Sequence, residues 1–283
     1  MIVFPNAKIN IGLNIIEKRS DGFHNIESIF YPIGLCDILE VVKNNLPSGE
    51  SKINFSSSGI LIPGNTQENL CVKAFYLLDK IYTLSSVNVH LHKIIPIGAG
   101  LGGGSSDAVF LMKALNELFD LKISEKEMQQ FATQLGSDCS FFVKNEPVFA
   151  EQKGEVHTDI SLDLSNFYCV LVYPKIHINT AFAYSETIPK KNIFELRKEI
   201  LNPVKEWKKN IFNDFESSVF KNHTEIKSIK EKLYELGASY VSMSGSGSAV
   251  YGIFEKKIIL KKNIFQNCFL WEGNLFRSKS QQE

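Results

Sequence analysis

Hydrophobic and polar residues alternate near the start of the chain, and this alternation predicts a β-strand. In NAKINIGLNII, aliphatic side chains recur at every second position from Ile9 to Ile15, so they lie on one face of the strand. Lys8 and Asn10 share the other face, roughly 6.5 Å apart along the strand. The pair Asp21-Gly22 follows and predicts a turn.

Other stretches predict a mixture of strands and helices. The remaining strands are expected near residues 29–42, 52–56, 86–94 and 167–174. Helical spacing predicts one helix over residues 67–82 and another directly after residue 104. Ser124 and Glu127 form a capping box that begins a third helix, and Gly136 is its expected end.

The second half of the chain repeats this mixture. Two or three helices are expected up to Leu236, then a strand, a Gly/Ser loop and a strand over residues 239–254, and finally one more helix and strand. The expected fold class is α+β, with a domain boundary near residues 150–165.

Charge and cysteine content narrow the classes of function. The 31 basic and 31 acidic residues give a net charge of +0, which argues against nucleic-acid binding. The five cysteines are scattered and form no C-x-x-C pair, so free thiols are expected rather than a zinc site or disulfides. Neither a secretory signal nor a run of 18 apolar residues is found, so we expect a cytoplasmic protein without membrane contact.

The segment PIGAGLGGGSSDA, residues 96–108, raises the question of a nucleotide site. Gly98, Gly100 and Gly103 satisfy G-x-G-x-x-G, the motif of dinucleotide-binding folds. Those folds also need a second strand that ends in an acidic residue about 20 positions on, whereas Asp120 stands at the end of a helix with no strand before it. No Gly-Lys pair supports a P-loop, and the H-R-D and D-F-G motifs of protein kinases are absent.

Two interpretations of this segment remain open. Its amides converge on a helix N-terminus and can cradle phosphate, with Ser105 and Ser106 supplying hydroxyl donors or an N-cap. Alternatively, the glycines form a tight turn that lets a helix pack closely on a strand.

The same segment resembles the second signature of the GHMP kinases. NAKINIGLNI is similar to their N-terminal signature, and SMSGSGSAVYGIF is similar to their C-terminal glycine loop. The resemblance implies a two-domain α+β fold. A ribosomal-protein-S5-like, nucleotide-binding domain would span residues 1–155, and a ferredoxin-like, substrate-binding domain would span residues 156–283. It also implies ATP-dependent phosphorylation of a small-molecule hydroxyl.

Three stretches narrow the resemblance to one branch of that family. KRSDGFHNIESIF, GLGGGSSDA and LGSDCSFFV, in this order, are similar to kinases whose acceptor is a cytidine-diphosphate-linked polyol of the non-mevalonate isoprenoid route. The alternatives are another small-molecule kinase of the family, of the mevalonate or homoserine type, and a catalytically inactive, ligand-binding relative.

The resemblance assigns roles to individual residues. Asp138 would be the general base for the acceptor hydroxyl, and Lys8 would orient it and favour ionisation. Without the resemblance, Lys8 is equally a solvated lysine and Asp138 a residue of a helix-flanking turn. The positions assigned to ATP are Asn69, Lys93, Pro96, Gly98, Gly100, Leu101, Gly102, Gly103, Gly104, Ser105 and Ser106.

The positions assigned to the acceptor are Asn10, Phe23, His24, Thr180, Tyr184, Gly245 and Ser246. Phe23 and Tyr184 would stack on cytosine, and His24 would contact it. The family usually has Tyr then Phe at the stacking positions, so here any hydroxyl contact from position 23 is lost. Read alone, these three are a packing residue of a turn, a surface histidine and a core tyrosine.

Lys93 and residues 245–247 also have plainer interpretations, as an exposed lysine at a strand end and as a hairpin turn. Magnesium is expected with ATP and held mainly through its phosphates. Ser106 is a candidate contact, and no acidic cage is present, so no metal ligand is assigned. The expected partners are ATP and a cytidine-containing substrate, and the chain is expected to be a monomer or a weak homodimer.

Overall fold

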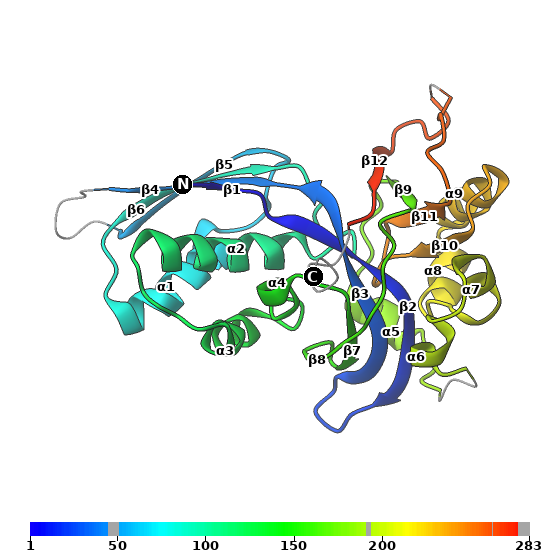
Figure 1. The fold of residues 1–283 in the computed structure, drawn as a ribbon, viewed down its shortest axis with the longest axis horizontal. Coiled ribbons are helices and arrows are strands. Elements are labelled where there is room, and N and C mark those ends of the chain that lie inside the picture. The colour runs from blue at the N-terminus through cyan, green and yellow to red at the C-terminus, as the bar shows by residue number, and fades with distance from the viewer. Residues whose placement is uncertain (45–50, 191–193, 262, 277–283) are drawn as a thin grey trace. The chain divides into compact units, whose positions relative to one another are not determined.

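The computed structural model describes residues 1–44, 51–190, 194–261 and 263–276 (Figure 1). The described chain forms two compact units. The first contains Met1–Ala7, Leu35–Ile97 and Gly102–Asn145, and the second contains Lys8–Gly34, Gly98–Leu101 and the described residues from Glu146 onward. The units therefore interleave along the chain, and the expected domains 1–155 and 156–283 stay a prediction.

The first unit is built on a four-stranded sheet with the order β1-β4-β6-β5. Its strands are β1 (Ile2–Val3), β4 (Ile38–Lys43), β6 (Val87–Lys93) and β5 (Ile53–Gly59). Only the β5–β6 pair is parallel among these pairs. Along β6 the side chains of Val87, Val89 and Leu91 are buried, whereas Asn88 and His92 are exposed, so one sheet face carries the core.

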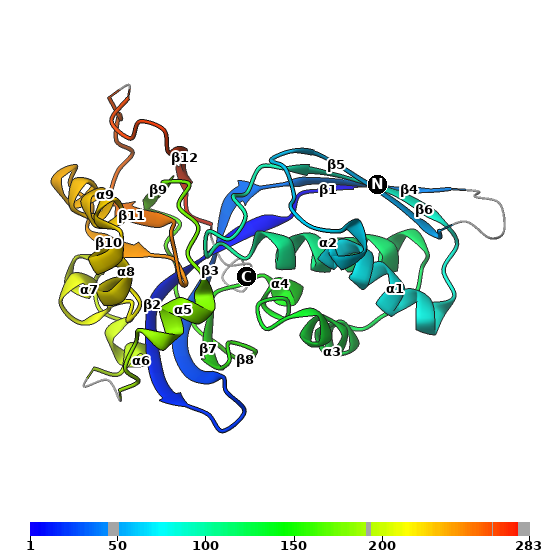
Figure 2. The ribbon, with the colours of Figure 1, turned by 180° about the vertical axis from the view of Figure 1, so that it is seen from behind.

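Helices cover that face of the sheet, as Figures 1 and 2 both show. The helical elements of the first unit are the 3-10 turn η1 (Thr66–Glu68), α1 (Leu70–Tyr82), α2 (Gly103–Leu118), α3 (Glu125–Leu135) and α4 (Phe141–Lys144). α2 contributes the buried side chains Leu111, Met112 and Leu115 to the core. Burial of such apolar stripes is the main stabilising force for helices of this length.

The second unit contains two further sheets, apart from the first two residues of β2 and the last two of β3, which belong to the first unit. The first has the order β2-β3-β7-β8, with β2 (Asn6–Lys18), β3 (His24–Cys36), β7 (Val148–Gln152) and β8 (Val156–Asp159). The other has the order β10-β11-β9-β12 and is antiparallel throughout, with β10 (Tyr240–Met243), β11 (Val250–Phe254), β9 (Tyr168–Tyr173) and β12 (Phe269–Asn274).

Short helices accompany these sheets. They are α5 (Thr180–Ser185), α6 (Leu196–Glu199), α7 (Val204–Asn210), α8 (Glu216–Asn222) and α9 (Thr224–Glu235). α9 packs on β10 and β11 and buries Ile226, Ile229 and Leu233 in a core shared with those strands. The pattern that predicted two or three helices therefore missed the shortest ones, because four to seven residues show too little periodicity.

Several local expectations are confirmed. The alternating segment forms β2, the Asp21-Gly22 turn leads into β3, and both hydrogen bonds of the Ser124–Glu127 capping box are present. The strand expected near residues 29–42 is divided into β3 and β4 at Asp37, whose carboxylate turns inward and accepts hydrogen bonds from the amides of Ile94 and Ile95.

Gly136 ends α3, as expected, and its φ of 167° is extended backbone. One expectation about the last part of the chain is wrong. The helix expected before the last strand is not found in the described residues between β11 and β12. Asn263 and Asn267 have positive φ values there, which a continuous helix does not tolerate.

Candidate active site

The glycine segment leads directly into the N-terminus of α2. Gly102 is the N-cap in a left-handed conformation, with φ of 69°, and the first helical hydrogen bond runs from the Ser106 amide to the Gly102 carbonyl at 2.9 Å. Ser105 and Ser106 therefore lie inside the first turn, and the interpretation of either serine as the N-cap is wrong. The amides of Gly103, Gly104 and Ser105 precede the first intrahelical bond, so they point out of the helix, where the macrodipole favours anions.

Individual glycines of this segment serve different purposes. A Cβ atom on Gly103 would lie 2.8 Å from Cγ2 of Ile95 and 3.0 Å from Nζ of Lys93, so this glycine permits the close packing of α2 on the end of β6. Gly104 is exposed, and the nearest atom to a Cβ there is Cδ1 of Leu70 at 3.8 Å. Close packing and an open approach for phosphate therefore coexist, at neighbouring positions.

Lys93 lies at the end of β6 in a buried ion cluster, so it is not an exposed lysine. The side chain is 3% exposed, and Nζ donates to Asp37 at 2.6 Å and to Asp107 at 2.5 Å. Burial alone would lower the pKa of Lys93, but the charges of Asp107 and Asp37 outweigh it and raise the pKa above its ordinary value. The cluster fixes both ends of the glycine segment, because Asp107 belongs to α2.

Asp107 is the carboxyl of this cluster whose pKa is raised. Burial, together with the neighbouring charge of Asp37, raises its pKa to about 8, and the opposing attraction of Lys93 does not compensate. Two carboxylates share a single ammonium in a dry site, so a proton on one of them removes the excess negative charge. Oδ1 of Asp107 and Oγ of Ser106 are both buried and have no hydrogen-bond partner among the described residues.

Lys8 and Asn10 lie side by side on β2 and are both buried. Nζ of Lys8 donates to Oδ1 of Asn10 at 2.6 Å and lies 4.6 Å from the ring centre of Phe30. Nδ2 of Asn10 donates to Ser28 at 2.9 Å. β2 therefore buries both of its faces here, and the amide of Asn10 orients the ammonium of Lys8.

The backbone of this part of β2 is tied to two loops of the second unit. The Lys8 amide donates to the Leu101 carbonyl at 3.0 Å, and the Asn10 amide donates to Oγ of Ser244 at 3.2 Å. The Ser244 hydroxyl in turn donates to the Gly100 carbonyl at 2.8 Å. Ser244 is a residue that sequence reasoning missed. It precedes the glycine of a loop that was noticed, but its contacts with residues more than 140 positions away leave no local signal.

Asp138 lies in the turn between α3 and α4, and its side chain is half-buried. Its neighbour Cys139 interacts with the hydroxyl of Ser105, which brings this turn to the first turn of α2. Burial raises the pKa of the Cys139 thiol to about 11, and the Ser105 hydroxyl opposes this only in part. Asp138 belongs to the first unit and Lys8 to the second, and each carries its own set of contacts.

His24 and Tyr184 are brought together, although 160 positions separate them in the sequence. Their rings are stacked, with centroids 4.6 Å apart and an interplanar angle of 14°. Burial, with a smaller contribution from Lys18, lowers the pKa of His24. Phe23 points elsewhere: its side chain is 58% exposed, and Nζ of Lys153 lies 5.0 Å from its ring centre.

The other predicted positions have structural partners of their own. Thr180 begins α5, and its hydroxyl lies 2.9 Å from that of Ser246, in the loop that contains Gly245. Asn69 caps α1 by accepting from the Cys71 amide at 2.8 Å, and Pro96 is buried.

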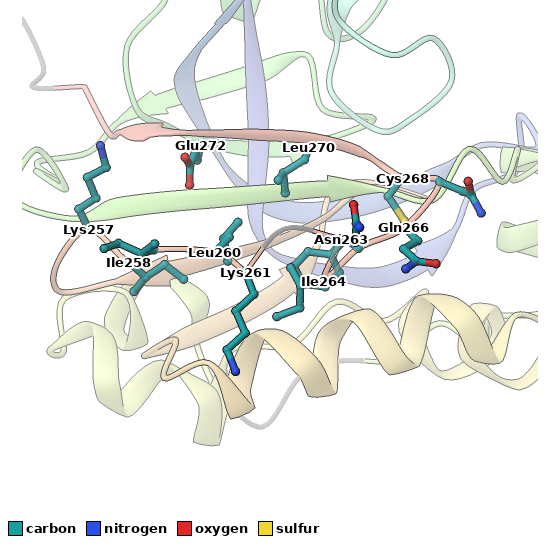
Figure 3. Close-up of a pocket in the computed structure, with 13 residues that line it drawn as sticks. Lys257, Ile258, Leu260, Lys261, Asn263, Ile264, Gln266, Cys268, Leu270 and Glu272 are labelled. Carbon is teal, nitrogen blue, oxygen red and sulfur yellow. The ribbon is translucent and has the colours of Figure 1, made fainter.

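A cavity of about 640 Å³ lies in another part of the second unit (Figure 3). Ile258, Leu260 and Ile264 of the turn-rich segment after β11 line one side, and Leu270 and Glu272 of β12 line the other. Ile258 and Leu260 also pack against the core of this unit. None of the predicted site residues is among those that line it, and we assign it no role in the reaction.

The described part of the chain also contains no cluster of three or more His, Cys, Asp or Glu side chains suited to a metal ion. No helix in residues 1–44, 51–190, 194–261 and 263–276 is long and apolar enough to span a bilayer.

Comparison with known proteins identifies the family. Residues 69–145 match the model of the GHMP kinases N terminal domain, and residues 195–263 match that of the GHMP kinases C terminal. The 4-diphosphocytidyl-2-C-methyl-D-erythritol kinase of Bacteroides thetaiotaomicron is 46% identical over 276 residues, which cover 97% of this chain and 100% of the relative. The chain belongs to the GHMP kinase family. A kinase of the same name from Azobacteroides pseudotrichonymphae is 49% identical over 257 residues, covering 90% of this GHMP kinase and 94% of the relative.

Solved structures agree with this assignment. A crystal structure of 4-(cytidine 5'-diphospho)-2C-methyl-D-erythritol kinase superposes with a TM-score of 0.74 and 28% identity, covering 89% of this chain and 90% of the other. A mevalonate kinase structure, at 16% identity and a TM-score of 0.67, covers 97% of this chain and 99% of its own and shares the fold. The α+β, two-domain GHMP kinase fold expected from the sequence is thereby confirmed, and this GHMP kinase is an ATP-dependent enzyme of that class.

Proposed function

We propose that this chain transfers the γ-phosphoryl group of ATP to the 2-hydroxyl group of 4-diphosphocytidyl-2-C-methyl-D-erythritol, in the non-mevalonate isoprenoid route. The similarity to kinases of that name over nearly the whole chain carries the proposal. The segments KRSDGFHNIESIF and LGSDCSFFV support it, because they narrowed the resemblance to this acceptor.

The phosphates of ATP are placed at the N-terminus of α2. Three outward-pointing amides and an exposed Gly104 favour a phosphate there, because the backbone can approach without a side chain in between. ATP enters as its magnesium complex, whose ion is held mainly by the phosphate oxygens. Ser106 stays a candidate contact of the ion, and its buried hydroxyl has no hydrogen-bond partner among the described residues.

Phosphoryl transfer requires alignment, charge neutralisation and an acceptor for the hydroxyl proton. We assign that proton to the Asp138 carboxylate, which is half-buried in a turn beside the first turn of α2. Lys8 is assigned to the acceptor oxygen, where a fixed ammonium favours the ionised form. The hydrogen bond to Asn10 already restricts the rotamers of Lys8, so this side chain loses little conformational entropy when the acceptor binds.

The cytosine ring is assigned to the neighbourhood of Phe23, His24 and Tyr184. The stacked pair of His24 and Tyr184 provides a flat aromatic surface. A pyrimidine base can stack on such a surface. Thr180, Gly245 and Ser246 are assigned to the same acceptor, because Thr180 and Ser246 already contact each other. We further propose a cytoplasmic monomer or weak homodimer that has no nucleic-acid or membrane partner.

A phosphoryl-transfer assay tests the proposal. The full chain is incubated with magnesium and γ-labelled ATP and, separately, with the cytidine acceptor, mevalonate and homoserine. Label is expected only on the cytidine acceptor. Transfer to mevalonate or homoserine alone would assign the chain to another branch, and ATP binding without any transfer would indicate an inactive relative.

A further inference from the structure

Four consecutive residues, Asn213–Glu216, lie between α7 and the first residue of α8, and the side chain of each one contacts another part of the second unit. Their sequence, NDFE, was not singled out by the pattern of the chain. The segment is attached to β2, since the Leu13 amide donates to the Phe212 carbonyl at 2.9 Å and the Asp214 amide donates to the Leu13 carbonyl at 2.8 Å. Asp214 completes the attachment by accepting from the Ile15 amide at 2.8 Å.

Asn213 holds the glycine loop that follows β10. Its side chain is 3% exposed, and Nδ2 donates to the carbonyls of Met243 and Gly245, both at 2.8 Å. Oδ1 accepts from the Phe215 amide at 3.0 Å. Both N–H groups and the oxygen are therefore used, which fixes the orientation of the amide and leaves no freedom to flip.

Glu216 holds the other side of the same loop entrance. Its carboxylate accepts from the Met243 amide at 2.8 Å and from Lys230 at 2.6 Å. Met243 is thus gripped at its N–H by Glu216 and at its C=O by Asn213. The point where β10 becomes the loop is set by side chains of another segment.

Phe215 supports the aromatic pair. Its ring is buried and meets the ring of Tyr184 edge-on, with centroids 4.8 Å apart and an interplanar angle of 84°. Tyr184 in turn stacks on His24. One short segment therefore lies behind both groups that we assign to the acceptor, namely the aromatic pair and the loop of Gly245 and Ser246.

We propose that Asn213 is a positioning residue for the acceptor, acting through the carbonyl of Gly245. Fixing that carbonyl orients the following residue, Ser246, whose hydroxyl lies 2.9 Å from that of Thr180. This inference rests on the proposed function for its kinetic test, but the structural link between Asn213 and the loop does not.

Asn213→Asp separates the two kinds of contact made by this side chain. The carboxylate keeps an oxygen for the Phe215 amide but faces two carbonyls with no hydrogen to donate. Asp214→Asn is the matched control, because it makes the reverse exchange one residue away and keeps an oxygen for the Ile15 amide. The melting temperatures of both variants establish that they are folded.

We expect Asn213→Asp to lower kcat/KM for the cytidine acceptor at least tenfold, whereas Asp214→Asn stays within about twofold of the wild type. The ratio of variant to wild type should rise as the pH falls from 8 to 5.5, because a protonated carboxyl donates one of the two lost hydrogen bonds. Equal kcat/KM values for Asn213→Asp and wild type, or a ratio independent of pH, would overturn the proposal.

Hydrogen exchange provides a readout that does not depend on the reaction. Amides of residues 244–248 should exchange at least tenfold faster in Asn213→Asp than in Asp214→Asn, while those of α9 remain unchanged. Unchanged exchange in the loop would refute the link itself. If the wild-type chain fails to phosphorylate the acceptor while the two variants still show this exchange difference, only the proposed function is refuted.

Discussion

Gly100 and Ser244 pack backbone against backbone: a Cβ atom on Gly100 would lie 1.9 Å from the Ser244 carbonyl oxygen. The Ser244 hydroxyl also donates to the Gly100 carbonyl at 2.8 Å. Two glycine-containing loops, 144 residues apart in the sequence, therefore meet with no space for a side chain between them. A resemblance to glycine-rich signatures names both loops but does not show that they depend on one another.

The first prediction concerns this contact. Gly100→Ala adds a methyl group into the Ser244 carbonyl at a position whose φ is +79°, so we expect the free energy of unfolding to fall by about 2–4 kcal/mol. Gly104→Ala is the control for stability, because its Cβ has open space and alanine is favoured over glycine in a helix, so it should not lower that free energy. Urea denaturation of both variants measures this, and equal midpoints would contradict the packing argument.

The second prediction concerns Asp138. Asp138→Asn keeps the shape of the side chain but removes its capacity to accept a proton, so turnover should fall by roughly 10²–10⁴-fold. The dissociation constant of ATP, measured by calorimetry, should stay within about twofold. Lys8→Ala should also fold and lose most turnover. Near-normal kcat in Asp138→Asn would remove the assignment of this residue as the general base.

The third prediction concerns pH and Asp107. Its folded pKa is raised to about 8 from an ordinary value of 3.8, so between these values the folded protein holds a proton that the unfolded chain has released. The stabilising contribution of this group is therefore complete below pH 3.8 and is lost as the pH rises through 8. Asp107→Asn cannot release a proton from this position.

The measurement is the difference in free energy of unfolding between wild type and Asp107→Asn. That difference should fall by roughly 1 kcal/mol per pH unit across the steepest part of the range from pH 5 to 8. Asp120→Asn, which changes an exposed carboxylate beside Lys122, serves as the control for the Asp-to-Asn exchange itself. A flat line for Asp107→Asn would show that this carboxyl is ionised throughout.

The fourth prediction concerns the aromatic pair. Tyr184→Ala removes the surface on which His24 stacks, so KM for the cytidine acceptor should rise by about tenfold or more, corresponding to 1–3 kcal/mol of lost stacking. Tyr184→Phe retains the ring and should restore KM to within about threefold. KM for ATP should be unchanged in both. An increase in the two KM values together would indicate a general loss of structure instead.

Local rules predicted the features that depend on neighbouring residues. The capping box of α3 joins Ser124 and Glu127, three residues apart, and the alternation of β2 is visible within ten residues. The burial of Lys8 was not predictable in this way, because it arises from Phe30 and from loops near residues 101 and 244. The same holds for Lys93, whose partners Asp37 and Asp107 lie 56 and 14 positions away.

The stacking of His24 on Tyr184 and the grip of Asn213 on Gly245 are of the same long-range kind. The helix that was expected before β12 is missing for a local reason. A continuous helix does not form there, since Asn263 and Asn267 have left-handed backbone conformations. Family resemblance supplied the candidate residues across these distances, and the structure supplies the contacts that make their roles testable.

The interleaving of the two units has a consequence for the order in which a nascent chain can fold. Each unit takes residues from at least three separate stretches of the chain, so no single cut separates one unit from the other. β3 pairs with β7, whose residues are synthesised more than 110 positions later, and β1 must find β4 across the intervening hairpin. The first unit is therefore complete only once residues up to Asn145 have been synthesised. The sheet of β2 and β3 is complete later still, because its strands β7 and β8 follow Asn145 in the chain.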